Sequence, residues 1–273
     1  MASEAGPPAH EVPVEQARSA HAAETEHLAG EGVAVARVRA DTVADVPVRI
    51  YEPEDASGTV VYLHGGGWVL GNLDSVDAVC RALANESRTC LVSVDYRLAP
   101  EHPFPAGLDD ALAVTRAVSG DVVAGDSAGG NLAAVVAREL REQLKLQLLI
   151  YPVTDAGVNT PSYAEFDGRY GLTAASMQRF WGLYLDGADG LQPAASPLRG
   201  ELEGLPPAYV ITASHDVLRD EGEAYANALE IAGVPVTLRR VEGAIHGFWR
   251  WQTTAIARDA VREAAAAVRS TLG

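Results

Sequence analysis

The stretch GDSAG at residues 125–129 decides the fold, because an apolar run comes directly before it and a helical pattern directly after it. The apolar residues 122–124 predict a buried strand, and the pattern from Ala128 onward predicts a helix. A serine between glycines at such a sharp strand-to-helix turn has an exposed Oγ, and the N-terminus of the following helix favours negative charge beside it. The motif therefore predicts that Ser127 is a nucleophile at the end of a strand.

Short apolar runs alternate with helical patterns along the rest of the chain. The runs that we interpret as strands, rich in β-branched residues, lie at 33–38, 46–51, 60–63, 91–94, 122–124, 146–151, 208–212 and 236–241. Helical patterns occupy 75–86, 107–118, 128–142, 221–232 and 254–271. Alternation of this kind is typical of a mostly parallel sheet with helices on both faces. We therefore predict one α/β domain over residues 1–273, with eight strands and an antiparallel first pair.

The interval 155–205 differs from the regions on either side of it. It contains Gly, Pro and Asn around one helical pattern at 173–185. An insertion of this length between two core strands predicts a cap over a site, and an ordinary crossover with long loops is the alternative. The aromatic residues that could line a pocket below it are Trp68, Phe180, Trp181, Tyr184 and Phe248.

A serine hydroxyl needs a base to become a nucleophile, and two later residues supply the partners. Asp216 follows the predicted strand 208–212, and His246 follows the predicted strand 236–241. Ser, acid and His in this order, each after a later strand, is the order of a catalytic triad on this kind of sheet. We expect His246 to take the serine proton and Asp216 to hold the imidazole tautomer. His215 precedes the last strand and would break that order.

The remaining polar residues predict no metal site. Histidines before residue 30, including His21, lie in a polar segment and are expected to be solvated. No two histidines have the helical spacing of a zinc site, so we expect no metal. The acidic residues Asp220, Glu221 and Glu223 are interpreted as the solvated first turn of a helix, where negative charge is favourable.

A second glycine-rich stretch, HGGGW at residues 64–68, follows the predicted strand 60–63. Consecutive glycines let backbone N–H groups approach a ligand closely. Together with the N–H of Ala128, such donors could hold the oxyanion of an acyl-transfer reaction. A phosphate-binding loop is the alternative, but the Lys-Ser/Thr ending of a P-loop is missing.

Charge and composition exclude several classes of partner. The chain has 21 Lys and Arg against 37 Asp and Glu, a net charge of −16 that disfavours nucleic acid and anionic lipid. It has no run of 18 apolar residues, and its acidic N-terminus is unlike a secretory signal. We therefore predict a cytoplasmic protein without membrane partners, whose two cysteines, Cys80 and Cys90, are reduced. The sequence sets no oligomeric state.

These motifs together resemble the hormone-sensitive-lipase-like (bacterial family IV) esterases of the α/β-hydrolase superfamily. The matching stretches are HGGGW at 64–68, DYRLAPEHPFPA at 95–106, GDSAGGN at 125–131, DVLRDEGEAYA at 216–226 and IHGF at 245–248. The resemblance implies the α/β-hydrolase fold, with a small helical cap built from about residues 1–30 and 155–205. One departure is Val217, where the family usually has proline after the acid.

The resemblance also implies an activity and assigns residues to it. It implies a carboxylic-ester hydrolase of short-to-medium acyl esters, acting through an acyl-enzyme intermediate and without a cofactor. The assigned residues are the triad Ser127, Asp216 and His246 and the oxyanion donors Gly66, Gly67 and Ala128. An amidase, peptidase or lactonase with the same triad is an alternative. A non-catalytic small-molecule receptor on this scaffold is another, but such a protein should lack a triad member, and this chain keeps all three.

Overall fold

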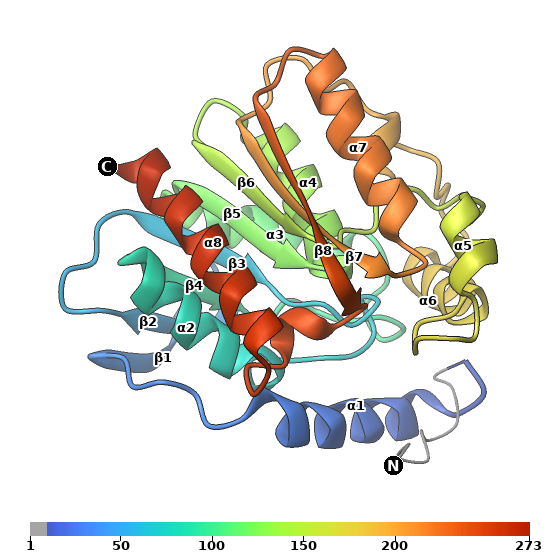
Figure 1. The fold of residues 1–273 in the computed structure, drawn as a ribbon, viewed down its shortest axis with the longest axis horizontal. Coiled ribbons are helices and arrows are strands. Elements are labelled where there is room, and N and C mark those ends of the chain that lie inside the picture. Colours follow the sequence, from blue (N-terminus) through green and yellow to red (C-terminus); the bar gives the residue numbers. More distant parts are fainter. Residues whose placement is uncertain (1–9) are drawn as a thin grey trace.

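The computed structural model describes residues 10–273, and its centre is one eight-stranded sheet (Figure 1). The strands are β1 (Arg37–Val43), β2 (Val46–Glu52), β3 (Thr59–Leu63), β4 (Cys90–Val94), β5 (Val122–Asp126), β6 (Leu146–Ile150), β7 (Ala208–His215) and β8 (Val236–Ile245). The helices are α1 (Val14–Ala29), α2 (Asp77–Ser87), α3 (Ala106–Ala117), α4 (Ala128–Glu139), α5 (Pro161–Phe166), α6 (Ala174–Leu185), α7 (Arg219–Ile231) and α8 (Ala255–Leu272). Three short 3₁₀ helices are η1 (Asp74–Val76), η2 (Pro197–Arg199) and η3 (Phe248–Arg250).

The strand order β1-β2-β4-β3-β5-β6-β7-β8 confirms the predicted mostly parallel sheet. Only the pairs β1–β2 and β2–β4 are antiparallel, and the remaining neighbours run parallel. Parallel strands place their carboxyl ends at one edge, which is where ligands bind in such sheets. The loops after β3, β5, β7 and β8 therefore meet at one edge.

The first strand was predicted too early in the chain. It begins at Arg37 rather than Val33, and Val33 is exposed. The register explains the difference, because the turn at Ala44 and Asp45, both with positive φ, pairs Val43 with Val46. From that turn the ladder runs out to Arg37, so the alternating residues before it have no partner strand.

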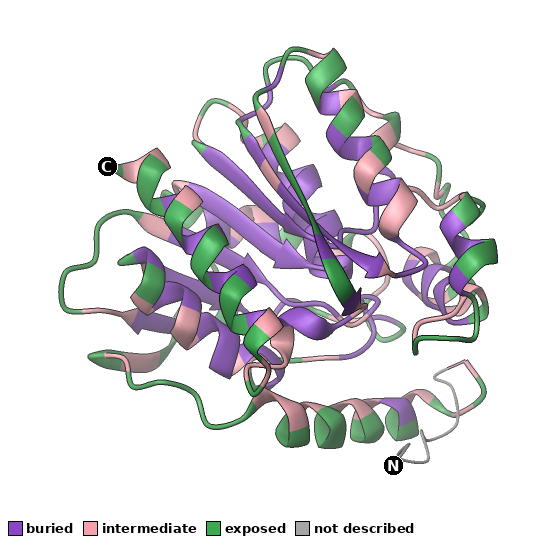
Figure 2. Ribbon diagram, viewed as in Figure 1, coloured by how far each residue is buried: buried purple, intermediate pink, exposed green. Residues whose placement is uncertain are grey.

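Two helical layers cover the sheet, one on each face. Helices α2 and α8 pack together over one face, and α3, α4 and α7 lie over the other (Figure 1). Figure 2 shows the central strands buried almost along their whole length, and all five residues of β5 are buried. Burial on both faces explains why these strands are continuous apolar runs rather than alternating ones.

Helices α1, α5 and α6 lie at the carboxyl edge of the sheet, away from the two layers (Figure 1). Arg18 holds α1 to the body by donating from Nε to the carbonyl oxygen of Val69 (2.9 Å) and from Nη2 to that of Ala99 (3.0 Å). The residues before α1 also contact α6, since Nη1 of Arg179 in α6 donates to the carbonyl oxygen of His10 (2.7 Å).

Two further predictions concern the chain as a whole. Cys80 is buried and Cys90 is half-buried, and both are free thiols. Among residues 10–273, no helix has the length and apolar character needed to cross a membrane.

Candidate active site

Ser127 stands at the turn between β5 and α4 in a backbone conformation that few serines adopt. Its φ is 57° and its ψ is −119°, so the chain reverses sharply and the side chain points out of the sheet edge. The turn brings Gly129 against β3, where a Cβ atom on Gly129 would lie 2.0 Å from the carbonyl oxygen of Leu63. Packing therefore requires glycine at position 129, two residues after the serine.

The structure brings the three predicted triad residues into one hydrogen-bonded chain. The Ser127 Oγ lies 3.0 Å from His246 Nε2, and His246 Nδ1 lies 2.7 Å from the Asp216 Oδ2. With a proton on Nδ1, the imidazole donates to the carboxylate and leaves Nε2 to accept from the serine hydroxyl. This arrangement is that of an activated serine nucleophile.

The acid is held in place by its own loop. Asp216 is buried, and its Oδ1 accepts a hydrogen bond from the backbone N–H of Leu218 (3.0 Å). Val217 stands where the family resemblance predicts proline, and its carbonyl oxygen accepts from the hydroxyl of Ser162 (2.6 Å). The departure at Val217 thus leaves the carboxylate oriented toward His246.

Tyr151 is a site residue that the sequence analysis missed. It follows the last residue of β6, has a φ of 34°, and packs its buried ring against the His246 imidazole with centroids 4.6 Å apart. Phe248 packs on the far side of Tyr151 at 5.7 Å. The signal that could have found Tyr151 is its place directly after a central parallel strand.

The glycine-rich loop at 64–68 is fixed from below. Tyr96 donates from its hydroxyl to the carbonyl oxygen of His64 (2.7 Å) and stacks its ring on the imidazole at 4.4 Å. The Oδ1 of Asp126 accepts from the Gly65 N–H (3.0 Å). Thus His64 shapes the loop.

Two backbone donors of this loop, at Gly66 and Gly67, have no acceptor among the described residues. Gly66 has a φ of 127°, and a Cβ there would lie 2.2 Å from the carbonyl oxygen of Leu70. Within residues 10–273, the N–H groups of Gly66 and Gly67 donate to no protein atom. The N–H of Ala128, the first residue of α4, has no acceptor inside its own helix. These groups are available to an oxygen bound next to Ser127.

A cavity of about 220 Å³ opens over Ser127 and His246 and has two unlike walls. Leu172, Met177 and Phe180, from α6 and the loop before it, form an apolar wall. Other parts of the lining are polar and include His21, Glu24, Asp126 and Arg250, here called the polar wall. Of the five aromatic residues proposed for a pocket, only Phe180 lines this cavity, since Trp68, Trp181 and Tyr184 pack on one another.

His21 is not solvated as predicted. Its Nε2 accepts a hydrogen bond from Nη1 of Arg250 (2.9 Å), and burial lowers the pKa of its imidazole well below the usual range. The two residues are far apart in the sequence, and only the docking of α1 brings them together. His215 lies outside the triad, as expected, with its Nδ1 2.8 Å from the Oγ of Ser214.

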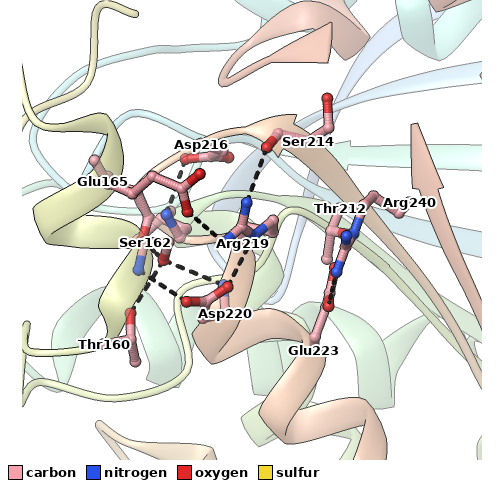
Figure 3. A network of polar contacts seen from close by, with 12 residues as sticks. Thr160, Ser162, Glu165, Thr212, Ser214, Asp216, Arg219, Asp220, Glu223 and Arg240 are labelled. Carbon is pink, nitrogen blue, oxygen red and sulfur yellow. Dashed lines mark hydrogen bonds and ion pairs between the residues drawn. The ribbon is translucent and has the colours of Figure 1, made fainter. Parts of the chain in front are cut away.

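The acidic turn after Asp216 is also less exposed than predicted. Asp220 accepts from the Ser162 N–H (2.8 Å) and from Arg219, so it ties α7 to the short helix α5 (Figure 3). Glu223 pairs with Arg240 at 2.5 Å in the same view. The prediction of a solvated first turn is therefore wrong for these residues, because long-range partners occupy their carboxylates.

Glu221 departs furthest from that prediction. It is buried, and its Oε1 accepts from the Thr154 N–H (2.7 Å) while its Oε2 contacts the hydroxyl of Tyr163 (3.0 Å). Burial raises the pKa of the Glu221 carboxyl to about 8. This side chain links the loop after β6 to helix α5, next to the loop that carries Asp216.

Within residues 10–273, no group of three or more His, Cys, Asp or Glu side chains is placed to hold a metal ion. The donors that meet in the cavity are instead a hydroxyl, an imidazole, a guanidinium and backbone N–H groups. Such a set is suited to polarising and attacking a carbonyl group.

Comparison with known proteins agrees with this geometry. A family model described as the alpha/beta hydrolase fold matches residues 60–250. The carboxylesterase NlhH of Mycobacterium tuberculosis is 44% identical over 231 residues, which cover 76% of this chain and 72% of that protein. The ethyl acetate hydrolase of Pseudomonas putida is 40% identical over 228 residues, 75% of this chain and 72% of that protein.

Solved structures give the same result over more of the chain. An esterase of Pyrobaculum calidifontis superposes with a TM-score of 0.90 at 41% sequence identity, covering 95% of this chain and 94% of that one. The chain belongs to the α/β-hydrolase fold family, within its hormone-sensitive-lipase-like esterases.

Proposed function

We propose that the protein hydrolyses carboxylic esters with Ser127 as nucleophile, His246 as general base and acid, and Asp216 as the group that orients His246. The observation that carries this proposal is the continuous chain of hydrogen bonds from Ser127 through His246 to Asp216. Ser127 attacks the ester carbonyl carbon and gives its proton to Nε2 of His246. The protonated imidazole then donates that proton to the leaving alcohol, and an acyl-enzyme ester remains.

The second half of the reaction uses the same groups with water. His246 removes a proton from a water molecule, the hydroxide attacks the acyl-enzyme carbonyl, and Ser127 recovers its proton as the acid departs. In both halves the tetrahedral oxyanion is proposed to accept from the N–H groups of Gly66, Gly67 and Ala128. Their lack of protein acceptors supports this role. Each such donor is worth roughly 10²–10³ in turnover in other enzymes.

The proposed substrates are esters of short-to-medium acyl chains. A cavity of about 220 Å³ lies below the usual range of roughly 300–1,000 Å³ for drug-sized ligands. The apolar wall formed by Leu172, Met177 and Phe180 suits a hydrocarbon chain, each buried methylene of which contributes roughly 0.8 kcal/mol. A relative named ethyl acetate hydrolase is in keeping with small substrates.

We further propose that residues 1–273 act as one domain in the cytoplasm, with about residues 1–30, which include α1, and 155–205 as the cap. Residues 1–9 lie outside the described structure. The contacts of Arg179 with His10 and of Arg18 with the loops below it support a joint role for the two segments. The net charge of −16 argues against nucleic-acid or anionic-membrane partners.

A panel of 4-nitrophenyl esters from acetate to palmitate, with the matching 4-nitroanilides, tests the reaction and its substrate range. We expect kcat/KM to peak between about C2 and C8, because each buried methylene adds binding until the cavity ends. The anilides should be turned over far more slowly. Faster cleavage of the anilides would favour an amidase, and a maximum at palmitate would contradict the proposed chain length.

A further inference from the structure

Arg250 is a buried arginine with few partners. It lies in η3, four residues after His246, with a side chain that is 14% exposed and lines the same cavity as Ser127. Its Nη1 donates to His21. Its Nε is buried without a hydrogen bond, 3.8 Å from Oδ2 of Asp126. Among residues 10–273, no hydrogen bond from Nη2 to a protein atom is present, and Nη2 lies near Gly247, which also lines the cavity.

Two of the three guanidinium nitrogens already face protein groups, since Nη1 donates to His21 and Nε lies beside Asp126. The hydroxyl of Tyr151 also interacts with the guanidinium. Nη2 is the remaining donor of a side chain that lines the same cavity as Ser127 and His246, so an acceptor supplied by the substrate can pair with it.

The surrounding charges indicate which kind of acceptor fits. Asp126 faces Nε, and the carboxylate of Glu24 lines the same wall, so two negative groups already flank one positive group. The hydroxyls of Tyr62 and Tyr151 also face Arg250, and both have pKa values raised well above their usual range by burial. His21, whose pKa is lowered, accepts from Arg250 as a neutral imidazole. The net negative charge would therefore repel an anionic substrate, whereas it would not repel a neutral carbonyl oxygen.

We propose that Arg250 is a specificity-determining residue that donates a hydrogen bond to a second, neutral carbonyl oxygen of the substrate. The substrate class is then an ester that carries a further ketone or ester carbonyl away from the scissile bond. The carbonyl lies toward the polar wall, while the hydrocarbon part of the same substrate lies against Leu172, Met177 and Phe180. This inference rests on the proposed ester hydrolysis at Ser127 and concerns only its selectivity.

The test compares esters matched in length with and without the second carbonyl. On the acyl side, the methyl 4-nitrophenyl diesters of succinic, glutaric and adipic acid are paired with 4-nitrophenyl hexanoate, heptanoate and octanoate. On the alcohol side, 2-oxopropyl acetate is paired with isobutyl acetate in a pH-stat assay. In at least one arm we expect the wild-type protein to prefer the carbonyl member by about 10- to 100-fold in kcat/KM, the range of one hydrogen bond to a charged group.

The variant Arg250→Met should remove that preference, mainly by slowing the carbonyl member. Arg18→Ala is the matched control, because it loosens the docking of α1 but keeps the guanidinium and its partner His21, and it should change both members of each pair by the same factor. Arg262→Met, on the exposed side of α8, controls for the loss of one positive charge. Mono(4-nitrophenyl) adipate, which carries a carboxylate, tests the choice of a neutral acceptor.

The outcomes separate the two proposals. Hydrolysis of hexanoate by the wild-type protein without any preference within the pairs would overturn the role of Arg250 and leave the proposed function intact. Failure to hydrolyse either member of any pair would overturn the proposed function itself. If Arg250→Met does not fold, as seen by circular dichroism, the wild-type preference within the pairs, divided by the ratio of their rates of alkaline hydrolysis, still decides. A preference for the adipate monoanion over the methyl diester would show that the acceptor is anionic.

Discussion

The two sides of the cavity are built in different ways. Ser127, Asp216 and His246 follow β5, β7 and β8, strands that lie in a continuous, mostly parallel sheet. On the cap side, α1 has only one buried residue, Ala17, among those described. The difference separates catalysis from substrate binding, because residues held by a backbone ladder are positioned more rigidly than residues held by single side-chain contacts. We therefore expect changes on the sheet side to alter turnover and changes on the cap side to alter substrate binding.

The largest effect should come from the sheet side. Ser127→Ala removes the nucleophile but little packing, and triad members act as a unit, so turnover of a 4-nitrophenyl ester should fall on the order of 10⁴-fold or more. Circular dichroism should show an unchanged fold. Near-normal turnover by a folded Ser127→Ala protein would refute the assignment of the nucleophile.

Two acids four residues apart sharpen the comparison. Asp216→Asn should reduce kcat on the order of 10⁴-fold, because an amide no longer holds the His246 tautomer. Asp220→Asn should cost less than about 10-fold, since Asp220 contacts only Ser162 and Arg219 at the foot of α5. The kcat values of the two purified variants, determined at one pH, measure this contrast. Equal losses of kcat would contradict the proposed division between the sheet side and the cap side.

The sequence predicted the sheet side better than the cap side, for a physical reason. Triad residues follow strands whose apolar runs are local signals, so Ser127, Asp216 and His246 could be placed from order alone. His21 and Arg250 meet only because α1 docks across the cavity, and no local pattern encodes a contact between residues so distant in the chain. The sequence accordingly assigns no role to Arg250 and predicts that His21 is solvated.

The acidic turn after Asp216 illustrates the same limit. A negative first turn is favourable whether its carboxylates face water or buried partners, so the pattern cannot separate the two cases. Glu221 is buried because Thr154 and Tyr163, from the loop after β6 and from α5, bring donors to it. The first strand was misplaced for a comparable reason, since the turn at Ala44 and Asp45 sets its register.

A smaller effect is expected where α1 is attached. Arg18→Ala removes the hydrogen bonds to Val69 and Ala99 and the pairing with Glu101 that hold this helix. Looser docking of one cavity wall should raise KM roughly 3- to 10-fold with little change in kcat, the signature of lost uniform binding. The control is Arg37→Ala on the exposed edge strand β1. A fall in kcat without a change in KM would mean that α1 takes part in the chemistry.

The smallest effect on activity, and a measurable one on stability, should come from Glu221, which joins the two sides. In the unfolded chain its carboxyl ionises near 4.3, whereas burial raises its pKa to about 8 in the folded protein. Between these values the unfolded state has released a proton that the folded state still holds. The free energy of unfolding should therefore fall as pH rises from about 4.5 to about 8, and level off above that.

Glutamine at this position should keep the contacts and lose the pH dependence. Its Oε1 can accept from the N–H groups of Thr154 and Asp155, and its Nε2 can donate to the hydroxyl oxygen of Tyr163, as a neutral carboxyl does. Urea unfolding of Glu221→Gln and the wild-type protein should give similar stabilities at pH 5. At pH 8.5 the variant should be more stable, by at most a few kcal/mol. Ester turnover should change less than about 3-fold, since no atom of Glu221 contacts the triad. If the stability difference instead grew as the pH fell, Glu221 would be ionised in the folded protein, held by its three donors.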